Sequence, residues 1–171
     1  MIGIFGSAFN PPTRGHLDGI IQALGFCEEV WLVPSISHAY GKKMLSFDER
    51  ISMVEAFVQD INDDRVKVSD LERELWDGTC PVYTICVAGA LQSRYPDKEF
   101  AFLFGPDNVL GLSGFEGAEL LVGQNRIISL CDRSNIRSTD VRTSRYFGDP
   151  FEHLVTPGVF NIIQEKRYYG Q

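Results

Sequence analysis

Short apolar runs that alternate with amphipathic segments are the feature that most constrains the fold of this chain. Each run has the length of a strand and is apolar on consecutive positions, as expected of strands buried on both faces. Because helical segments separate the runs, each connection is expected to be a right-handed crossover that leaves neighbouring strands parallel. We therefore predict an α/β fold with a parallel five-stranded sheet flanked by helices. The predicted strands are Ile2–Phe5, Val30–Val33, Val66–Val68, Phe100–Phe104 and Ile127–Leu130.

Helix start signals lie between and after the predicted strands. Ser46 and Glu49 form a capping-box pattern, in which the serine accepts from the third helical amide and the glutamate reaches back to the cap amide. Thr156 followed by Pro157 is typical of a helix start, because proline is favoured at the first helical position. Further helices are predicted over His16–Leu24, from a cap at Thr84 to before Pro96, and from a cap at Ser138 or Thr139.

Length, charge and cysteine pattern limit the class of protein. The 171 residues fit one domain, so we predict a single domain over residues 1–171 with a C-terminal helical segment, about 138–171, packed on it. A formal net charge of −7 argues against nucleic-acid and anionic-membrane partners, because such binders usually carry a basic face. The N-terminus lacks a signal-peptide pattern, no apolar run is long enough to span a bilayer, and the four cysteines show no C-x-x-C pairing. We expect a cytoplasmic protein without a protein-bound metal.

The segment from Gly6 to His16 has the character of a phosphate-binding turn. Ligands of parallel sheets bind beyond the carboxyl ends of the strands, and small residues followed by a helix start favour phosphate there. The helix dipole disfavours a charged ring at His16, so we expect a neutral imidazole that donates to a phosphate oxygen. A redox dinucleotide site is not expected, because Pro11 and Pro12 stand where a G-x-G-x-x-G turn needs close backbone approach.

Two short motifs carry a resemblance to a known superfamily. Thr13-x-Gly15-His16 is similar to the (H/T)-x-G-H signature of nucleotidyltransferases, and Ile136–Arg142 resembles their second signature, I-S-S-T-x-I/V-R, with Arg137 where serine is usual. Over nearly its whole length the chain resembles the nicotinate- or nicotinamide-mononucleotide adenylyltransferases. The resemblance implies a Rossmann-like sheet of the nucleotidyltransferase type. The other segments that carry it are Val33–Ser35 with Lys42, Glu72 with Tyr83–Thr84, Phe102–Asp107 and Leu154–Tyr168.

The resemblance implies an adenylyltransferase that joins AMP from ATP to nicotinate or nicotinamide mononucleotide and releases pyrophosphate, a step of NAD biosynthesis. The attacking phosphate is already ionised, so catalysis needs positioning and charge neutralisation rather than a protein base. Mg²⁺ is expected to arrive with ATP rather than in a protein cage. The implied partners are thus ATP and a mononucleotide, and self-association stays open because related enzymes are often oligomeric.

Roles for the nucleotide site follow from the motifs and the chemistry together. We predict that His16 donates to the α-phosphate, that Thr13 supports the same phosphate, and that Lys42, with Lys43 as its alternative, neutralises charge between the substrates. The amides of Ser138 and Thr139 are predicted to hold the β- and γ-phosphates together with Arg142. The turn around His16 and the Ser138–Thr139 turn are expected to face each other across a gap sized for a triphosphate. The residues predicted to bind ATP are Ser7, Ala8, Phe9, His16, Gly105, Asp107, Ser138, Thr139 and Arg142, with Asp107 accepting from ribose hydroxyls.

The acceptor's pyridine ring requires an aromatic face and a hydrogen-bonding partner. We predict that Tyr83, Thr84 and Phe115 bind the ring and that Arg133 binds the phosphate of the mononucleotide. Plain core packing is the alternative for the aromatic side chains.

Two departures from the family pattern keep other functions open. Phe115 stands where tryptophan is common, and only about seven residues separate the fifth strand from Ser138, where relatives usually carry a longer insertion. The nearest alternative is pantetheine-phosphate adenylyltransferase, because Thr13–Asp18 and Phe47–Arg50 resemble that family too. The other is a non-catalytic nucleotide-binding module of the same fold. The sequence decides neither between the acid and amide acceptors nor whether residues 34–46 close on a ligand.

Overall fold

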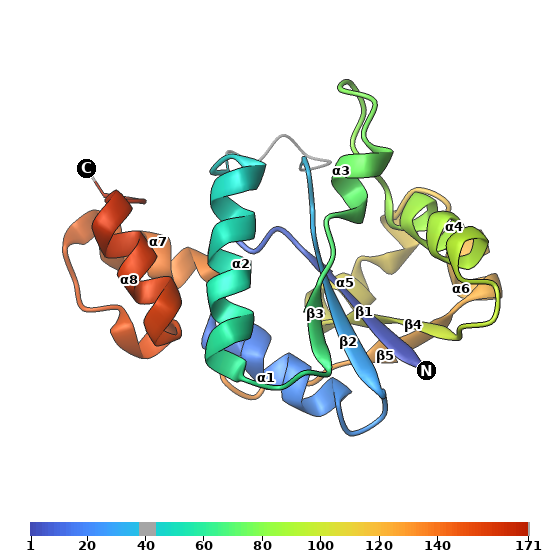
Figure 1. The fold of residues 1–171 in the computed structure, drawn as a ribbon, viewed down its shortest axis with the longest axis horizontal. Helices are drawn as coiled ribbons and strands as arrows, with labels where there is room; N and C mark the ends of the chain where they lie inside the picture. The colour runs from blue at the N-terminus through green and yellow to red at the C-terminus, as the bar shows by residue number, and fades with distance from the viewer. Residues whose placement is uncertain (38–43, 171) are drawn as a thin grey trace.

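The computed structural model describes residues 1–37 and 44–170, which form one sheet with helices on both sides (Figure 1). All neighbouring strands are parallel, which confirms the predicted α/β class. The strands are β1 (Ile2–Ser7), β2 (Glu29–Pro34), β3 (Val66–Val68), β4 (Phe100–Phe104) and β5 (Arg126–Ser129). The α-helices are α1 (Arg14–Ala23), α2 (Phe47–Ile61), α3 (Leu71–Leu75), α4 (Thr84–Arg94), α5 (Pro106–Leu110), α6 (Ala118–Gln124), α7 (Ser138–Phe147) and α8 (Pro157–Lys166). Short 3-10 helices cover Leu112–Gly114 and Glu152–Leu154.

The strand order β3-β2-β1-β4-β5 sets the place of a ligand site. The chain runs outward from β1 to β3 on one side of the sheet, then crosses to β4 and β5 on the other side. The direction of winding therefore reverses between β1 and β4, and a crevice is expected at their carboxyl ends. Ser7 at the end of β1 is in register with Pro34 of β2, and Phe104 of β4 is in register with Ser129 of β5. The loops after these four strands consequently leave the sheet at one edge.

Helices cover both faces of the sheet. On one face, Ile20 of α1 and Phe57 of α2 are fully buried in a cluster that includes Leu32 of β2. On the other face, Leu91 of α4 and Leu121 of α6 pack in a second cluster with strand residues of β1 and β4. Both faces thus bury apolar side chains, which explains why the strands are apolar on consecutive positions.

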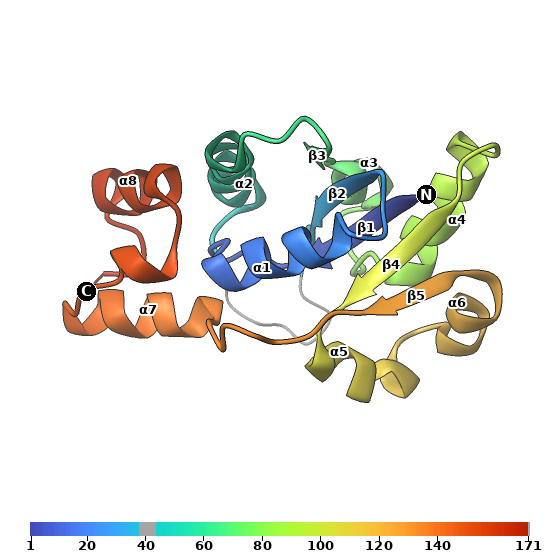
Figure 2. The ribbon, with the colours of Figure 1, turned by 90° about the horizontal axis from the view of Figure 1, so that it is seen from below.

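The C-terminal helices α7 and α8 lie together beyond α2, on the side away from the sheet (Figures 1 and 2). Three side chains of these helices are fully buried: Val141 of α7 and Val159 and Ile163 of α8. They belong to the same hydrophobic cluster as Val54 of α2. The segment from residue 138 to 170 therefore shares the hydrophobic core of the sheet domain. Within residues 1–37 and 44–170, every helix is too short or too polar to cross a membrane.

Two predicted helix caps are correct and two are shifted by one residue. Ser46 and Glu49 form the expected reciprocal capping box before α2, and Thr156 caps α8 with proline at its first position. The predicted cap at Thr84 is wrong, because Tyr83 is the cap and Thr84 is the first helical residue.

The start of α7 also differs from the prediction. Arg137 is the cap residue, so Ser138 and Thr139 are the first two helical residues rather than the cap. The carboxylate of Asp140 accepts from the Arg137 amide at 2.7 Å and closes the turn. The amides of Ser138 and Thr139 consequently belong to the first helical turn, where intrahelical partners are lacking.

Candidate active site

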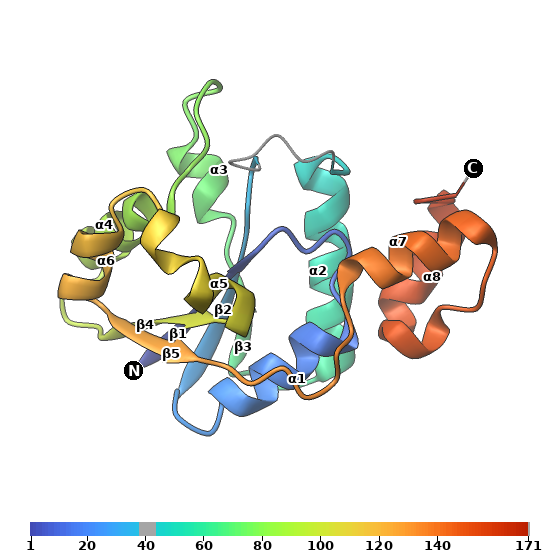
Figure 3. The same cartoon turned by 180° about the vertical axis from the view of Figure 1, so that it is seen from behind.

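The turn between β1 and α1 lies directly against the turn that leads into α7. A Cβ placed on Gly15 would fall 2.3 Å from the Ile136 carbonyl oxygen. The Ser138 hydroxyl donates to the Pro11 carbonyl at 2.7 Å, and Arg142 Nη1 donates to the Asn10 carbonyl at 2.7 Å. Figure 3 shows the segment after β5 running past the start of α1 into α7. The two signature motifs, more than a hundred residues apart in sequence, therefore form one structural unit.

Thr13 fixes which nitrogen of the His16 ring carries the proton. The Thr13 backbone N–H donates to His16 Nδ1 at 3.0 Å, and the Thr13 hydroxyl lies 3.0 Å from the same nitrogen. An amide can only donate, so Nδ1 of the neutral ring is an acceptor and the ring proton resides on Nε2. Nε2 lies 3.2 Å from the hydroxyl of Ser7 at the end of β1. His16 therefore presents a fixed N–H donor toward the carboxyl edge of the sheet.

The surroundings of His16 keep its ring uncharged. Removal from bulk water, which is the larger cause, and the nearby Arg137 guanidinium together lower its pKa from 6.5 to about 4. The ring of the buried Phe9 packs against the imidazole, with the centroids 4.9 Å apart. At neutral pH His16 is thus a neutral donor, as its position at a helix start leads one to expect.

We expect His16 to stay neutral, protonated on Nε2, in solution down to about pH 5. The check is a titration of the imidazole ¹⁵N signals by NMR, with a His16→Gln variant to assign the ring among the three histidines. A midpoint near 4 is the expected result, because the native ring resists protonation that an exposed histidine accepts near 6.5. A midpoint near 6.5, or a proton on Nδ1, would contradict the geometry described above.

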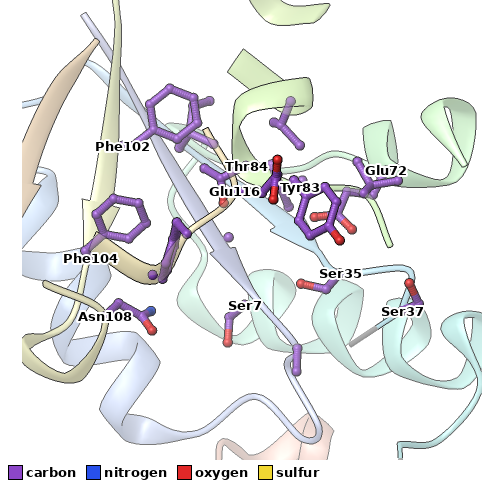
Figure 4. Close-up of a pocket in the computed structure, with 18 residues that line it drawn as sticks. Ser7, Ser35, Ser37, Glu72, Tyr83, Thr84, Phe102, Phe104, Asn108 and Glu116 are labelled. Atoms are coloured by element: carbon purple, nitrogen blue, oxygen red, sulfur yellow. The ribbon is translucent and has the colours of Figure 1, made fainter. Parts of the chain in front are cut away.

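A cavity of about 550 Å³ opens beside this donor at the carboxyl ends of β1, β2 and β4 (Figure 4). Tyr83, Thr84 and Phe115, which we predict to bind the acceptor ring, are among the residues that line it. Phe115 packs edge-on against Phe104 of β4, with the ring centroids 5.6 Å apart. Ser7 also lines the cavity, so this residue joins the cavity to the His16 donor.

The other residues predicted to bind ATP lie near the paired turns, that is, the turn between β1 and α1 and the turn that leads into α7, and only some of them line the cavity. Ala8 lines the cavity, whereas the Phe9 side chain is fully buried. Gly105 caps α5, and Asp107 in the first turn of α5 is exposed and forms an ion pair with Arg137 at 3.3 Å. Arg142 spans the contact between the turns, because Nη2 donates to Thr139 Oγ1 at 2.9 Å while Nη1 holds the Asn10 carbonyl.

Two predicted residues lie elsewhere than their predicted roles require. Thr13 is fully buried and contacts His16, so we revise its proposed role from binding phosphate to positioning the imidazole. Arg133 is exposed and is absent from the lining of the cavity among the described residues, so the structure gives it no contact with the acceptor site. Lys42 and its alternative Lys43 lie outside the described residues.

Sequence reasoning missed a buried arginine that holds the loops of the site. Arg50 is 1% exposed, and its guanidinium donates to the carbonyls of Ala8 and Ser35, both at 2.7 Å. Its Nε donates to the Leu45 carbonyl at 3.0 Å. Arg50 thereby ties the turn after β1 to both ends of the segment between β2 and α2. The signal was present, because Arg50 occupies the apolar stripe of α2 three, four and seven residues before buried side chains.

Two further polar residues complete this support. Asn10 is 3% exposed, and its side-chain oxygen accepts from the Leu45 amide at 3.3 Å and from the Tyr169 hydroxyl at 2.9 Å. The Glu72 carboxylate accepts from the Ile36 amide at 2.9 Å and lines the cavity. Burial raises the pKa of Glu72 to about 7, and this outweighs the lowering by the Ile36 amide and the Arg50 charge. The loop after β1 is therefore held from α2, α7 and the C-terminus at once.

Two helix starts and a neutral imidazole donor meet beside a cavity at the switch point of a parallel sheet, an arrangement suited to the phosphates of a nucleotide. Comparison with known proteins assigns the chain to the nucleotidyltransferases. Residues 4–144 match the family model described as cytidylyltransferase-like. The probable nicotinate-nucleotide adenylyltransferase of Shouchella clausii is 32% identical, over 99% of this chain and 96% of the relative. The chain belongs to this cytidylyltransferase-like family and, within it, to the nicotinate-nucleotide adenylyltransferases.

Solved structures share the fold over nearly the whole chain. A Vibrio parahaemolyticus protein that bears the same activity in its name superposes with a TM-score of 0.86 at 32% identity, covering 98% of this chain and 94% of that one. The nicotinic acid mononucleotide adenylyltransferase of Plasmodium falciparum, solved with NaAD, has a TM-score of 0.80 at 17% identity and covers 98% and 96% of the two chains. The latter likeness is one of fold.

Proposed function

We propose that this chain transfers AMP from ATP to nicotinate or nicotinamide mononucleotide and releases pyrophosphate. The observation that carries the proposal is the position of Ser7 and His16. His16 Nε2 contacts Ser7, and Ser7 lines the cavity that also contains Tyr83, Thr84 and Phe115. A phosphate bound between Ser7 and His16 would lie next to the paired turns on one side and next to an acceptor in the cavity on the other.

The reaction needs the chain to bring two phosphates together. An oxygen of the acceptor's phosphate attacks the α-phosphorus of ATP, and a new phosphorus–oxygen bond forms. The bond to the bridging oxygen toward the β-phosphate breaks, and pyrophosphate leaves with the bonding electrons. His16 donates from Nε2 to an α-phosphate oxygen as negative charge builds there. This hydrogen bond replaces the contact of Nε2 with the Ser7 hydroxyl. The first-turn amides of Ser138 and Thr139 bind the β- and γ-phosphates.

The remaining roles are proposed on position and charge. Arg142 adds positive charge at the paired turns, and Asp107 accepts from the ribose once its ion pair opens. Lys42 is kept as a proposed charge neutraliser. A divalent cation, proposed to be Mg²⁺, travels with the nucleotide and is bound through phosphate oxygens and water. A cytoplasmic location and self-association stay predictions.

The acceptor is proposed to be the nicotinate form in preference to the amide. Tyr83 and Thr84 bring the amino-terminal end of α4 to the cavity wall, and a helix start favours a carboxylate. Glu72, which also lines the cavity, opposes an anion less than an ordinary glutamate because its pKa is raised to about 7. The names of the relatives agree with the nicotinate form.

The test is pyrophosphate release from ATP with each of three acceptors: nicotinate mononucleotide, nicotinamide mononucleotide and phosphopantetheine. We expect the highest kcat/KM with nicotinate mononucleotide, because the cavity offers aromatic faces and a helix start for a flat anionic ring. Release with phosphopantetheine alone would replace the proposed function by the pantetheine-phosphate alternative. Release with none of the three, from a chain that still binds ATP, would favour the non-catalytic module.

A further inference from the structure

Arg137 is a charged residue at the nucleotide side of the site that the roles above leave unused. It caps α7, immediately before the two residues whose amides are proposed to hold the β- and γ-phosphates. Its guanidinium forms ion pairs with Asp132 after β5, at 2.7 Å, and with Asp107 of α5, at 3.3 Å. The side chain is 46% exposed, so half of it remains open to solvent and to a ligand. Arg137 therefore bridges the loops after β4 and β5 beside the start of α7.

Three carboxylates surround the turn at Arg137: Asp140 accepts from the Arg137 amide, while Asp107 and Asp132 pair with its guanidinium. These carboxylates would repel a triphosphate, so a positive charge is needed there when the nucleotide binds. Arg142 already donates from both terminal nitrogens to protein oxygens across the two turns. Arg137, in contrast, pairs with Asp107 through an exposed contact at 3.3 Å, and ion pairs of this kind contribute little to stability.

The exchange is favourable on chemical grounds. A guanidinium presents parallel N–H donors that match two phosphate oxygens, and such charge-assisted pairs are stronger than an exposed contact with one carboxylate oxygen. The Arg137 charge also acts on the imidazole, where it helps to lower the pKa of His16. The guanidinium is thus within electrostatic reach of the group proposed to bind the α-phosphate.

We propose that Arg137 binds the pyrophosphate portion of ATP, giving up its ion pair with Asp107 as the nucleotide enters. The proposal rests on the ATP site of the proposed function and adds a phosphate-binding residue to it. Release from Arg137 would leave the Asp107 carboxylate free for the ribose hydroxyls.

The experiment measures binding by calorimetry, with Mg²⁺ present and no acceptor. Wild type, Arg137→Gln, Arg137→Lys and Asp132→Asn are each titrated with ATP, inorganic pyrophosphate and AMP. Loss of a charged hydrogen-bond donor is expected to weaken ATP and pyrophosphate binding by roughly tenfold or more in Arg137→Gln. AMP, which lacks the β- and γ-phosphates, should bind within about twofold of wild type, and Arg137→Lys should recover part of the loss.

The Asp132→Asn variant separates ligand binding from loop anchoring. It breaks the 2.7 Å ion pair but keeps the Arg137 charge, so ATP binding is expected to stay within about threefold of wild type. Equal ATP binding by Arg137→Gln and wild type would overturn the proposal. An equal loss of AMP binding, or an equal loss of ATP binding in Asp132→Asn, would also overturn it, because Arg137 would then only anchor the loop.

Folding and function are controlled separately. Near-ultraviolet circular dichroism and Tm establish that each variant is folded. If Arg137→Gln does not fold, the binding constants of Arg137→Lys are compared with those of wild type instead. The binding experiment contains no acceptor, so it does not depend on the transfer reaction. If the wild-type protein binds ATP but releases no pyrophosphate in the acceptor assay, only the proposed function is contradicted. If the wild-type protein releases pyrophosphate while Arg137→Gln binds ATP as tightly as wild type, only the proposal for Arg137 is contradicted.

Discussion

A His16→Ala variant is expected to transfer AMP about 100 to 1,000 times more slowly than wild type, the usual result of removing one preorganised donor to a developing oxyanion. The ring is held on Nδ1 by the Thr13 amide, so its Nε2 proton needs no reorientation when charge builds on the α-phosphate. The ring is also neutral, with a pKa near 4, so donation does not depend on protonation at working pH. The effect should fall on kcat, because the donor acts most strongly in the transition state.

The matched control is His16→Gln, whose amide N–H₂ reaches the region that Nε2 occupies. It should retain more activity than the alanine variant, while both keep the fold, since His16 is partly exposed. The measurement is kcat and KM for ATP at saturating acceptor, with Tm of each variant. Wild-type kcat in a folded alanine variant would remove His16 from the chemistry.

A Gly15→Ala variant is expected to be both less stable and nearly inactive. The added Cβ would lie 2.3 Å from the Ile136 carbonyl oxygen, closer than any ordinary contact, and that oxygen is backbone. The two turns must separate, and overpacking of this kind costs about 1–3 kcal/mol in the free energy of unfolding. Separation also moves His16 away from the Ser138–Thr139 amides, and a shift of about 1 Å at a reacting group can lower the rate about 100-fold.

Gly89→Ala is the matched control for this substitution. Gly89 lies in the exposed interior of α4, and a Cβ there would meet nothing within 4 Å. Alanine in a helix interior is more favourable than glycine by about 1 kcal/mol, so this variant should be slightly stabilised and fully active. The measurements are urea unfolding and pyrophosphate release. If Gly15→Ala matched Gly89→Ala in both, the two turns would not be in the contact described above.

The sheet could be predicted because its pattern is local and repeated. Strands buried on both faces must be apolar at every position, and this leaves runs such as Phe100–Phe104 that are hard to mistake. The short helices α3, α5 and α6 could not be predicted in the same way. With five to seven residues, they have too few turns for an apolar stripe, and tertiary contacts decide their formation.

The site was predictable where a motif fixes a residue by itself, and not where a long-range contact decides. His16 and the Ser138–Thr139 turn followed from short signatures. The role of Thr13 did not, because a threonine beside a phosphate turn and a threonine beneath an imidazole share one sequence pattern. Asn10 was missed because its partners, the Leu45 amide and the Tyr169 hydroxyl, lie far from it in the sequence. The place of Arg50 in the apolar stripe of α2 indicated its burial, but its carbonyl partners in distant loops could not be predicted.

The central claim is that the paired turns and the Ser7–His16 boundary hold the triphosphate of ATP beside the cavity that receives the acceptor. A crystal structure of the chain with a non-hydrolysable ATP analogue tests it most directly. We expect an α-phosphate oxygen about 3 Å from His16 Nε2, with the β- and γ-phosphates at the start of α7. A triphosphate bound elsewhere, with His16 Nε2 still on Ser7, would contradict it.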